Sequence, residues 1–272
     1  MTAVILPTIL RPHQPLTLER LGAHCDGGYL VDPRDVAASD GLISMGVAID
    51  WSFEKDFARV NKGPVLAYDG SLSVWYLMAR TVRDTLLLRS ANSIASSARL
   101  VTDYLRFFSG RVKHIRSYVG TLQASYRKTF APSISFEQAF GEIRALGSSK
   151  PFLKIDIEGS EYSILTELVS AAQFTTGLAI EFHQCGQHLD EIAAFVERYP
   201  LRLIHIHVNS YTPIDACGCP GALELTFSSN AEENVLPPVL PHPLDRPNDG
   251  SSKQSEIQFA QDRAHGFCVC AR

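Results

Sequence analysis

The sequence lacks the short motifs by which several common enzyme classes are recognised. It has no Gly-x-x-x-x-Gly-Lys-[Ser/Thr] phosphate loop, no Gly-x-Gly-x-x-Gly, no His-Glu-x-x-His and no Gly-x-Ser-x-Gly. Each of these motifs places a phosphate-binding turn, a metal site or a nucleophile at a defined point of a fold. Their absence argues against the common nucleotide hydrolases, the standard dinucleotide oxidoreductases, the zinc peptidases and the serine hydrolases.

Long apolar runs are absent as well. No segment offers the roughly 18 consecutive apolar residues of a membrane span. The N-terminal stretch MTAVILPTIL has neither a basic leader nor a small-residue cleavage site. We therefore expect a cytoplasmic protein without a membrane partner. The formal net charge of −4 also argues against nucleic acid as the main partner, because phosphate binding requires a basic surface.

Cysteine is scarce. The 272 residues include six cysteines, too few for a disulfide scaffold and in keeping with a reducing compartment. Four of them form two Cys-x-Cys pairs, Cys217 with Cys219 and Cys268 with Cys270. Two interpretations stay open: a zinc site, for which Cys-x-x-Cys is the usual spacing, or reduced thiols without a shared function.

Basic residues gather in one part of the chain. Residues 80–128 contain ten lysines and arginines against two aspartates, Asp84 and Asp103. The pattern fits either a solvated helical face or a patch that attracts an anionic ligand. The second interpretation predicts a negatively charged partner such as a sugar phosphate, a nucleotide sugar or a uronic acid.

Apolar, strand-like runs alternate with helical patterns along the chain. This alternation is typical of an α/β fold with a mainly parallel sheet. Seven strands are expected, at residues 41–47, 65–71, 112–120, 152–158, 177–183, 201–209 and 222–228. Helices are expected near residues 53–60, over 136–146 and 189–199, and as a long interrupted stretch over 74–110.

The same pattern suggests one domain over residues 1–272. Residues 1–40 are expected to form an N-terminal cap segment, and residues 72–110 a helical insert. The stretch LPPVLPHPLDRPNDG is so rich in proline that we expect residues 229–272 to form an extended C-terminal arm.

Three of the expected strands carry polar side chains on one face, towards their C-terminal ends. These side chains are Lys154, Asp156 and Glu158; Glu181 and His183; and His205, His207 and Asn209. A half-exposed strand with a solvated face explains any one set. An unpaired charge in a core is costly, however, and open parallel sheets bind ligands beyond the carboxyl ends of their strands. Three sets together therefore predict a cleft at that edge of the sheet.

Several segments occur in the order found in a known enzyme family. They are RLGAHCDGGYLV, ISMGVAIDWSFEKDFA, FLKIDIEGSEYSIL, LAIEFH, HIHVNSY and LELTFS, between residues 20 and 228. They resemble the FkbM-type family of S-adenosylmethionine-dependent methyltransferases, with KIDIEGSEY as the most specific motif. The resemblance implies an α/β class I methyltransferase (Rossmann-like) fold. Its seven-stranded sheet is mainly parallel with a final antiparallel strand, and helices cover both faces.

The resemblance also implies S-adenosyl-L-methionine as the cofactor. This ligand needs a close-approach turn after the first strand, a carboxylate for the ribose hydroxyls after the second, and polar groups near its methionyl end. Gly46 and Asp69 occupy the first two positions, although Asp69, in the stretch YDGS, also suits an ordinary turn. The turn MGVAIDWSFE departs from the family in having one glycine instead of several. The predicted cofactor-binding residues are Gly46, Val47, Asp69, Gly70, Ser71 and Asp156.

Asp156, Glu181 and His183 are the predicted catalytic residues. His183 is the candidate base for an acceptor hydroxyl, flanked by the two carboxylates. Alternatively, the three side chains hold Mg²⁺ or a similar hard cation, which the similarity to metal-dependent sugar O-methyltransferases implies. The predicted substrate contacts are Glu158, His207 and Tyr29.

The leading hypothesis is an S-adenosylmethionine-dependent O-methyltransferase that acts on a hydroxyl of a sugar or a small secondary metabolite, with or without a divalent metal. The alternative is a non-catalytic module that keeps the fold and binds a nucleotide or a glycan. N-methylation also stays open. The expected partner is a small-molecule acceptor, anionic if the basic stretch faces it. The sequence leaves open whether the chain forms a homo-oligomer.

Overall fold

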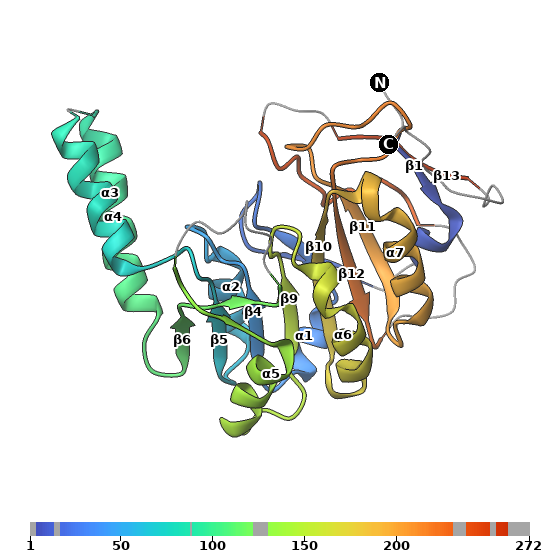
Figure 1. Ribbon diagram of the computed structural model, residues 1–272, viewed down its shortest axis with the longest axis horizontal. Helices are drawn as coiled ribbons and strands as arrows, with labels where there is room; N and C mark the ends of the chain where they lie inside the picture. Colours follow the sequence, from blue (N-terminus) through green and yellow to red (C-terminus); the bar gives the residue numbers. More distant parts are fainter. Residues whose placement is uncertain are drawn as a thin grey trace.

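The computed structural model describes residues 4–13, 17–87, 89–121, 130–230, 238–250 and 254–260. Seven strands form its central sheet, in the order β11-β12-β10-β9-β4-β5-β6 (Figure 1). Their bounds are Leu42–Met45 (β4), Val65–Tyr68 (β5), Val112–Ile115 (β6), Phe152–Ile155 (β9), Gly177–His183 (β10), Arg202–Val208 (β11) and Ala222–Ser228 (β12).

The strand directions confirm the predicted fold class. Strands β4, β5, β6, β9 and β10 pair in parallel, whereas β12 lies antiparallel between β10 and β11. From β4 the chain proceeds through β5 to β6 on one side, then returns to β9 and continues to β10 on the other. The boundary between β4 and β9 is therefore the topological switch point, next to which open α/β sheets bind their ligands.

Helices cover both faces of the sheet, as predicted. Helices α1 (Pro33–Ala38) and α2 (Ser52–Val60) lie on one face; α5 (Phe136–Ala145), α6 (Leu165–Ala171) and α7 (Cys185–Arg198) lie on the other (Figure 1). Successive strand residues point to opposite faces. Leu42 of β4 thus packs in one core cluster with Phe57 of α2, and Ile43 packs in a second cluster with Phe140 of α5.

The expected helical stretch over residues 74–110 is a hairpin of two helices, α3 (Val74–Leu86) and α4 (Ala91–Phe107), which projects away from the sheet (Figure 1). Serines begin both helices. The Ser73 hydroxyl accepts from the Tyr76 N–H at 3.1 Å, and the Ser90 hydroxyl accepts from the Ser93 N–H at 3.3 Å. Capping of this kind satisfies N–H groups that have no partner within the helix.

The prediction of one strand over residues 112–120 is wrong. Strand β6 ends at Ile115, where the Ser117 N–H donates to the Ile115 carbonyl at 2.8 Å and turns the chain out of the sheet. The next strand, β7 (Tyr118–Val119), pairs with β8 (Ser133–Ile134) in a separate two-stranded sheet. This turn brings residues 117–119 to the carboxyl edge of the central sheet.

Two further small sheets hold the N-terminal segment. Strand β1 (Val4–Pro7) runs parallel to β13 (Ile257–Ala260), and β2 (Glu19–Leu21) runs antiparallel to β3 (Tyr29–Val31). Short 3₁₀ helices complete the described elements: η1 (Thr8–Leu10), η3 (Glu161–Ile164) and η4 (Ala172–Phe174). The assignment of the whole chain to one domain, with a cap, an insert and an arm, stays a prediction.

Of the two Cys-x-Cys pairs, for which zinc binding stays open, one lies among the described residues. Cys217 forms a disulfide bond, so the expectation of reduced thiols is wrong at this position, while Cys25 and Cys185 carry free thiols. Cys268 and Cys270 lie outside the described residues. In the part of the chain that the structure describes, every helix is too short or too polar to cross a bilayer.

The described part of the Pro-rich arm is held to β11 by buried charges. The Asp245 Oδ1 lies 2.9 Å from His205 Nε2 and 3.7 Å from His207 Nδ1. Burial raises the pKa of Asp245, but hydrogen bonds and charge from His205 and His207 outweigh burial and lower it. Burial lowers the pKa of His207, but Glu224 and Asp245 outweigh burial and raise it to about 9.

These shifts make the arm's contribution to stability depend on pH. Because the His207 pKa is raised on folding, its stabilisation is complete below the unfolded pKa of 6.5 and is lost as the pH rises through about 9. The pKa of Asp245 is lowered on folding, so the stabilisation by its carboxylate is fully present above the unfolded pKa of 3.8. The Asp245→Asn substitution should therefore cost more unfolding free energy at about pH 6 than at about pH 10.

Urea denaturation of both proteins at the two pH values measures this difference. The matched control is Asp190→Asn, which removes an exposed carboxylate from α7, and its effect should not change with pH. An equal loss of unfolding free energy at both pH values for Asp245→Asn would contradict a charge interaction between Asp245 and His207.

Candidate functional site

The turn after β4 crosses directly over the end of β9. Gly46 has a φ of 79°, and a Cβ atom built on it would lie 1.5 Å from the Asp156 carbonyl oxygen. The Gly46 N–H donates to the Tyr68 carbonyl at 2.9 Å. Only glycine combines this left-handed conformation with so close an approach of two backbones. The one glycine of the predicted cofactor turn is thus required at its position.

Asp69, at the end of β5, organises this turn. Its Oδ2 accepts from the Val47 and Ala48 N–H groups at 3.0 and 2.7 Å. Its Oδ1 accepts from the Ser71 N–H and hydroxyl at 2.7 and 2.6 Å, and from the Leu72 N–H at 3.0 Å. Burial raises the pKa of Asp69, but these hydrogen bonds outweigh burial and lower it. The carboxylate therefore stays charged and fixes the backbone around it.

A cavity lies beside this turn, at the carboxyl edge of the sheet. Six of the predicted site residues line it: Gly46, Val47, Asp69, Ser71, Asp156 and Glu158. Gly70 is not among the lining residues, and the Tyr118 ring occupies the space where a side chain at Gly70 would lie. Lys154, from the polar set predicted at this edge, also lines the cavity. Sequence reasoning did not assign the remaining lining residues, which are Asp26, Gly27, Ala48, Asp50, Tyr68, Ser117, Tyr118, Val119, Ile157 and Ser160.

The lining of the cavity is acidic. Five carboxylates contribute to it, from Asp26, Asp50, Asp69, Asp156 and Glu158, and Lys154 is the basic residue in the same lining. Burial raises the pKa of Asp26, and Asn248 opposes this shift. Such a lining favours a ligand that carries positive charge near its carboxylates.

Lys154 connects β9 to the turn after β4. Its side chain is buried, and Nζ donates to the Gly46 carbonyl and lies 3.5 Å from Asp156 Oδ2. Burial lowers the pKa of Lys154, but the charges of Asp156, Glu54 and Glu181 outweigh burial and raise it. The ammonium group therefore stays protonated and balances part of the acidic lining.

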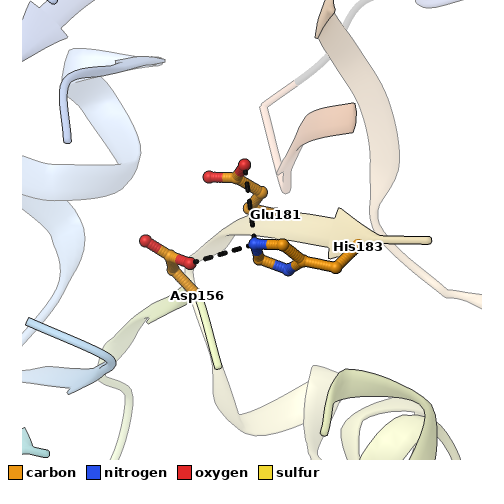
Figure 2. A group of neighbouring side chains, drawn as sticks. All are labelled: Asp156, Glu181 and His183. Atoms are coloured by element: carbon orange, nitrogen blue, oxygen red, sulfur yellow. Dashed lines mark ion pairs between the residues drawn. The ribbon is translucent and has the colours of Figure 1, made fainter. Parts of the chain in front are cut away.

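The three predicted catalytic residues converge at one point (Figure 2). His183 Nε2 lies 3.8 Å from Asp156 Oδ1 and 3.8 Å from Glu181 Oε1. One ligand atom from each of the three side chains lies within 4.8 Å of the others. Asp156 follows β9, whereas Glu181 and His183 belong to the adjacent strand β10, so strand pairing sets this geometry.

Glu161 orients the imidazole ring of His183 from the side opposite Asp156 and Glu181. Its Oε1 lies 2.5 Å from His183 Nδ1, and its side chain is fully buried. Burial lowers the pKa of His183, but Glu161, Glu181 and Asp156 outweigh burial and raise it to about 10. Because Nδ1 is directed to Glu161, Nε2 is the nitrogen that faces Asp156 and Glu181. Sequence reasoning missed Glu161, although it lies within the motif EGSEY.

Two neutral side chains position the carboxylates. The Tyr29 hydroxyl lies 3.3 Å from both Asp156 Oδ2 and Glu181 Oε2 and can donate to either. The Asn209 amide donates to Glu181 Oε1 at 2.6 Å. Tyr29, a predicted substrate contact, is buried and does not line the cavity. The structure thus places it behind the carboxylates.

The other predicted substrate residues lie in different places. Glu158 lines the cavity and has a φ of 56°. Ala48 and Gln184 have φ values of 48° and 54°, so strained backbone follows three neighbouring strands at this edge. Strain of this kind clusters at functional sites. His207 is instead buried, with Nε2 3.0 Å from Asn248 Oδ1, outside the cavity lining.

Comparisons with known proteins carry no argument about the fold or the function. No family model matches the chain, and no curated protein matches it. A solved structure, the Methanococcus jannaschii fibrillarin pre-rRNA processing protein, aligns with 80% of this chain and 84% of that chain, at 8% identity and a TM-score of 0.34. A likeness this distant carries no argument about function. The resemblance to the FkbM-type family therefore stays a prediction.

The geometry at Gly46 predicts that Gly46→Ala is strongly destabilising. The methyl group would meet the Asp156 carbonyl in a backbone conformation that alanine disfavours, at a cost of about 2–4 kcal/mol. Thermal or urea unfolding measures the loss. Gly147→Ala is the matched control, because Gly147 has a φ of 91° with open space around it, and should cost about 1 kcal/mol. Equal losses for the two variants would contradict the close contact between the turn at Gly46 and the Asp156 carbonyl.

Proposed function

We propose that this protein is an S-adenosylmethionine-dependent methyltransferase that methylates a hydroxyl group of a sugar or a small secondary metabolite. One observation carries the proposal: Asp156 both lines the cavity and belongs to the cluster with Glu181 and His183. A methyl donor in the cavity and an acceptor at the cluster would meet at this side chain. Methyl transfer requires such alignment of two partners more than it requires covalent help from the protein.

The cavity suits S-adenosylmethionine in position and charge. It lies next to the switch point of the sheet, where the turn at Gly46 and Val47 permits close approach of a ligand. The sulfonium and ammonium groups of the cofactor are positive, which matches the carboxylates of the lining. Asp69 holds the turn in place through its five hydrogen bonds.

The cluster of Asp156, Glu181 and His183 fits a divalent cation. Ligand atoms around an ion at about 2.1 Å lie roughly 3–4 Å apart, and the His183 Nε2 distances to the two carboxylates are both 3.8 Å. Two carboxylates and one imidazole suit Mg²⁺ or Mn²⁺. A bound cation would lower the pKa of an acceptor hydroxyl.

The surroundings of His183 favour the role of ion ligand over that of general base. Nε2 lies within 4 Å of three carboxylates, those of Asp156, Glu158 and Glu181. Glu161 and Tyr29 hold the imidazole and the carboxylates in fixed orientations, as outer partners of metal ligands do. The side chains of the cluster would thus hold an ion beside which the acceptor oxygen is oriented.

A neutral acceptor fits the lining better than an anionic one. The basic stretch alone suggested an anionic acceptor, but its arginines over residues 80–106 belong to the projecting hairpin, and none of them lines the cavity. Carboxylates line it instead. The cytoplasmic location and the absence of a nucleic-acid partner stay predictions, and the oligomeric state stays open.

A second candidate function is a non-catalytic module that binds a nucleotide or a glycan. Both oxygens of Asp69 already accept hydrogen bonds from the turn. This favours a glycan over either ribose-containing ligand, because the carboxylate expected to bind ribose has less capacity for further donors.

Calorimetric titration with S-adenosylmethionine separates the two functions. We expect saturable heat that fits one site. The Asp156→Asn variant should bind the ligand at least tenfold more weakly, which is a loss of roughly 1.4 kcal/mol in binding free energy. Asp190→Asn, on the exposed surface of α7, should bind like the wild type. No heat at millimolar ligand would favour the non-catalytic module.

Metal binding is tested without reference to activity. Titration with Mn²⁺, followed by electron paramagnetic resonance, should show one site in the wild type and at least a tenfold loss of affinity in His183→Ala. Glu161→Gln should weaken binding about tenfold, since Nδ1 loses its charged partner. His24→Ala is the control, because His24 is exposed and belongs neither to the cluster nor to the cavity lining. Equal binding by His183→Ala and the wild type would exclude a metal site at the cluster.

A further inference from the structure

One face of helix α3 is apolar and exposed. Trp75, Met78, Val82 and Leu86 recur at intervals of three or four residues, which places them in one stripe along the helix. Trp75 is 76% exposed, Val82 57% and Leu86 77%. Leu87, at the tip of the hairpin, is also exposed. Contiguous apolar stripes of this kind mark interaction surfaces.

This stripe is separate from the face that joins the two helices of the hairpin. Leu77 and Asp84 are the buried residues of α3, and the Ser97 hydroxyl of α4 donates to Asp84 at 2.6 Å. The exposed stripe lies away from that contact. It also extends beyond the sheet, since the hairpin projects from the body of the molecule (Figure 1).

The charge of the hairpin is positive. Its arginines are Arg80, Arg83, Arg89, Arg99 and Arg106. Its two carboxylates are engaged within the molecule: Asp84 accepts from Ser97 and Arg83, and Asp103 accepts from Trp51 and Lys55. An occupant of the apolar stripe should therefore be negatively charged. A second copy of the chain would place arginines against arginines, which opposes self-association through this face.

We propose that the α3–α4 hairpin binds the surface of an anionic membrane, with the apolar stripe of α3 in the headgroup region and the arginines on the phosphates. An amphipathic helix with tryptophan and leucine on one face and arginines beside it lies in such an interface. Tryptophan prefers this depth, and arginine reaches the phosphates with its long side chain. The helix rests on the bilayer without spanning it.

This proposal departs from the sequence expectation of no membrane partner, which concerned spanning segments. The hairpin begins close to the cavity, because Ser71 lines the cavity and α3 starts at Val74. Docking of the hairpin would hold the cavity near the lipid surface. Membrane binding does not depend on methyl transfer, so either can be tested without the other.

Tryptophan fluorescence of the full chain tests the proposal. The protein has two tryptophans; Trp51 is 2% exposed and Trp75 76%, so a shift to shorter wavelength on entry into lipid reports on Trp75. Vesicles of phosphatidylcholine mixed with phosphatidylserine should shift the emission to shorter wavelength, and vesicles of phosphatidylcholine alone should shift it less. Added salt should weaken binding, because the arginine contacts are screened.

A double variant, Val82→Ser with Leu86→Ser, keeps Trp75 as the probe and should bind about tenfold more weakly. Val60→Ser with Leu146→Ser removes exposed apolar side chains elsewhere and should bind like the wild type. Unchanged emission with anionic vesicles, or equal binding by the double variant, would overturn the proposal. A wild-type dimer in sedimentation equilibrium that the double variant loses would identify a second copy as the occupant and also overturn it.

Discussion

The site depends on the buried ammonium group of Lys154. This group donates to the carbonyl of Gly46 and lies 3.5 Å from Asp156, so it ties the turn after β4 to the end of β9. The charges of Glu54 and Glu181 also stabilise the protonated form of Lys154. Without a cation at this position, several carboxylates would share a desolvated region with little to balance them. One interaction thus maintains both the backbone turn and the acidic lining.

Two groups of residues meet at the carboxyl edge of the sheet. The first comprises the turn at Gly46, held by Asp69, and the second comprises Asp156, Glu181 and His183, held by Glu161, Tyr29 and Asn209. Parallel pairing of β4 with β9 and of β9 with β10 places them side by side. The outer partners fix the side chains, so little reorganisation is needed when a ligand enters.

The α/β class and the convergence of Asp156, Glu181 and His183 could be predicted, because alternating strand and helix patterns indicate a parallel sheet, whose strands end at one edge. The antiparallel last strand was implied only by the resemblance to a known family. Other features could not. The chain leaves the sheet after Ile115 through a local backbone turn, and His207 pairs with Asp245 and Asn248 from a segment distant in sequence. Glu161 acts through His183, and no spacing rule identifies such a partner. The projection of the hairpin likewise depends on tertiary contacts.

The central claim is that the cavity and the cluster form one site that shares Asp156. A crystal structure of the protein with S-adenosylhomocysteine and Mg²⁺ tests this most directly. The account predicts the nucleoside beside Gly46 and Asp69, and the ion between Asp156, Glu181 and His183, with the ligand's sulfur directed towards the ion. A nucleoside bound elsewhere, or an ion that avoids all three side chains, would contradict it.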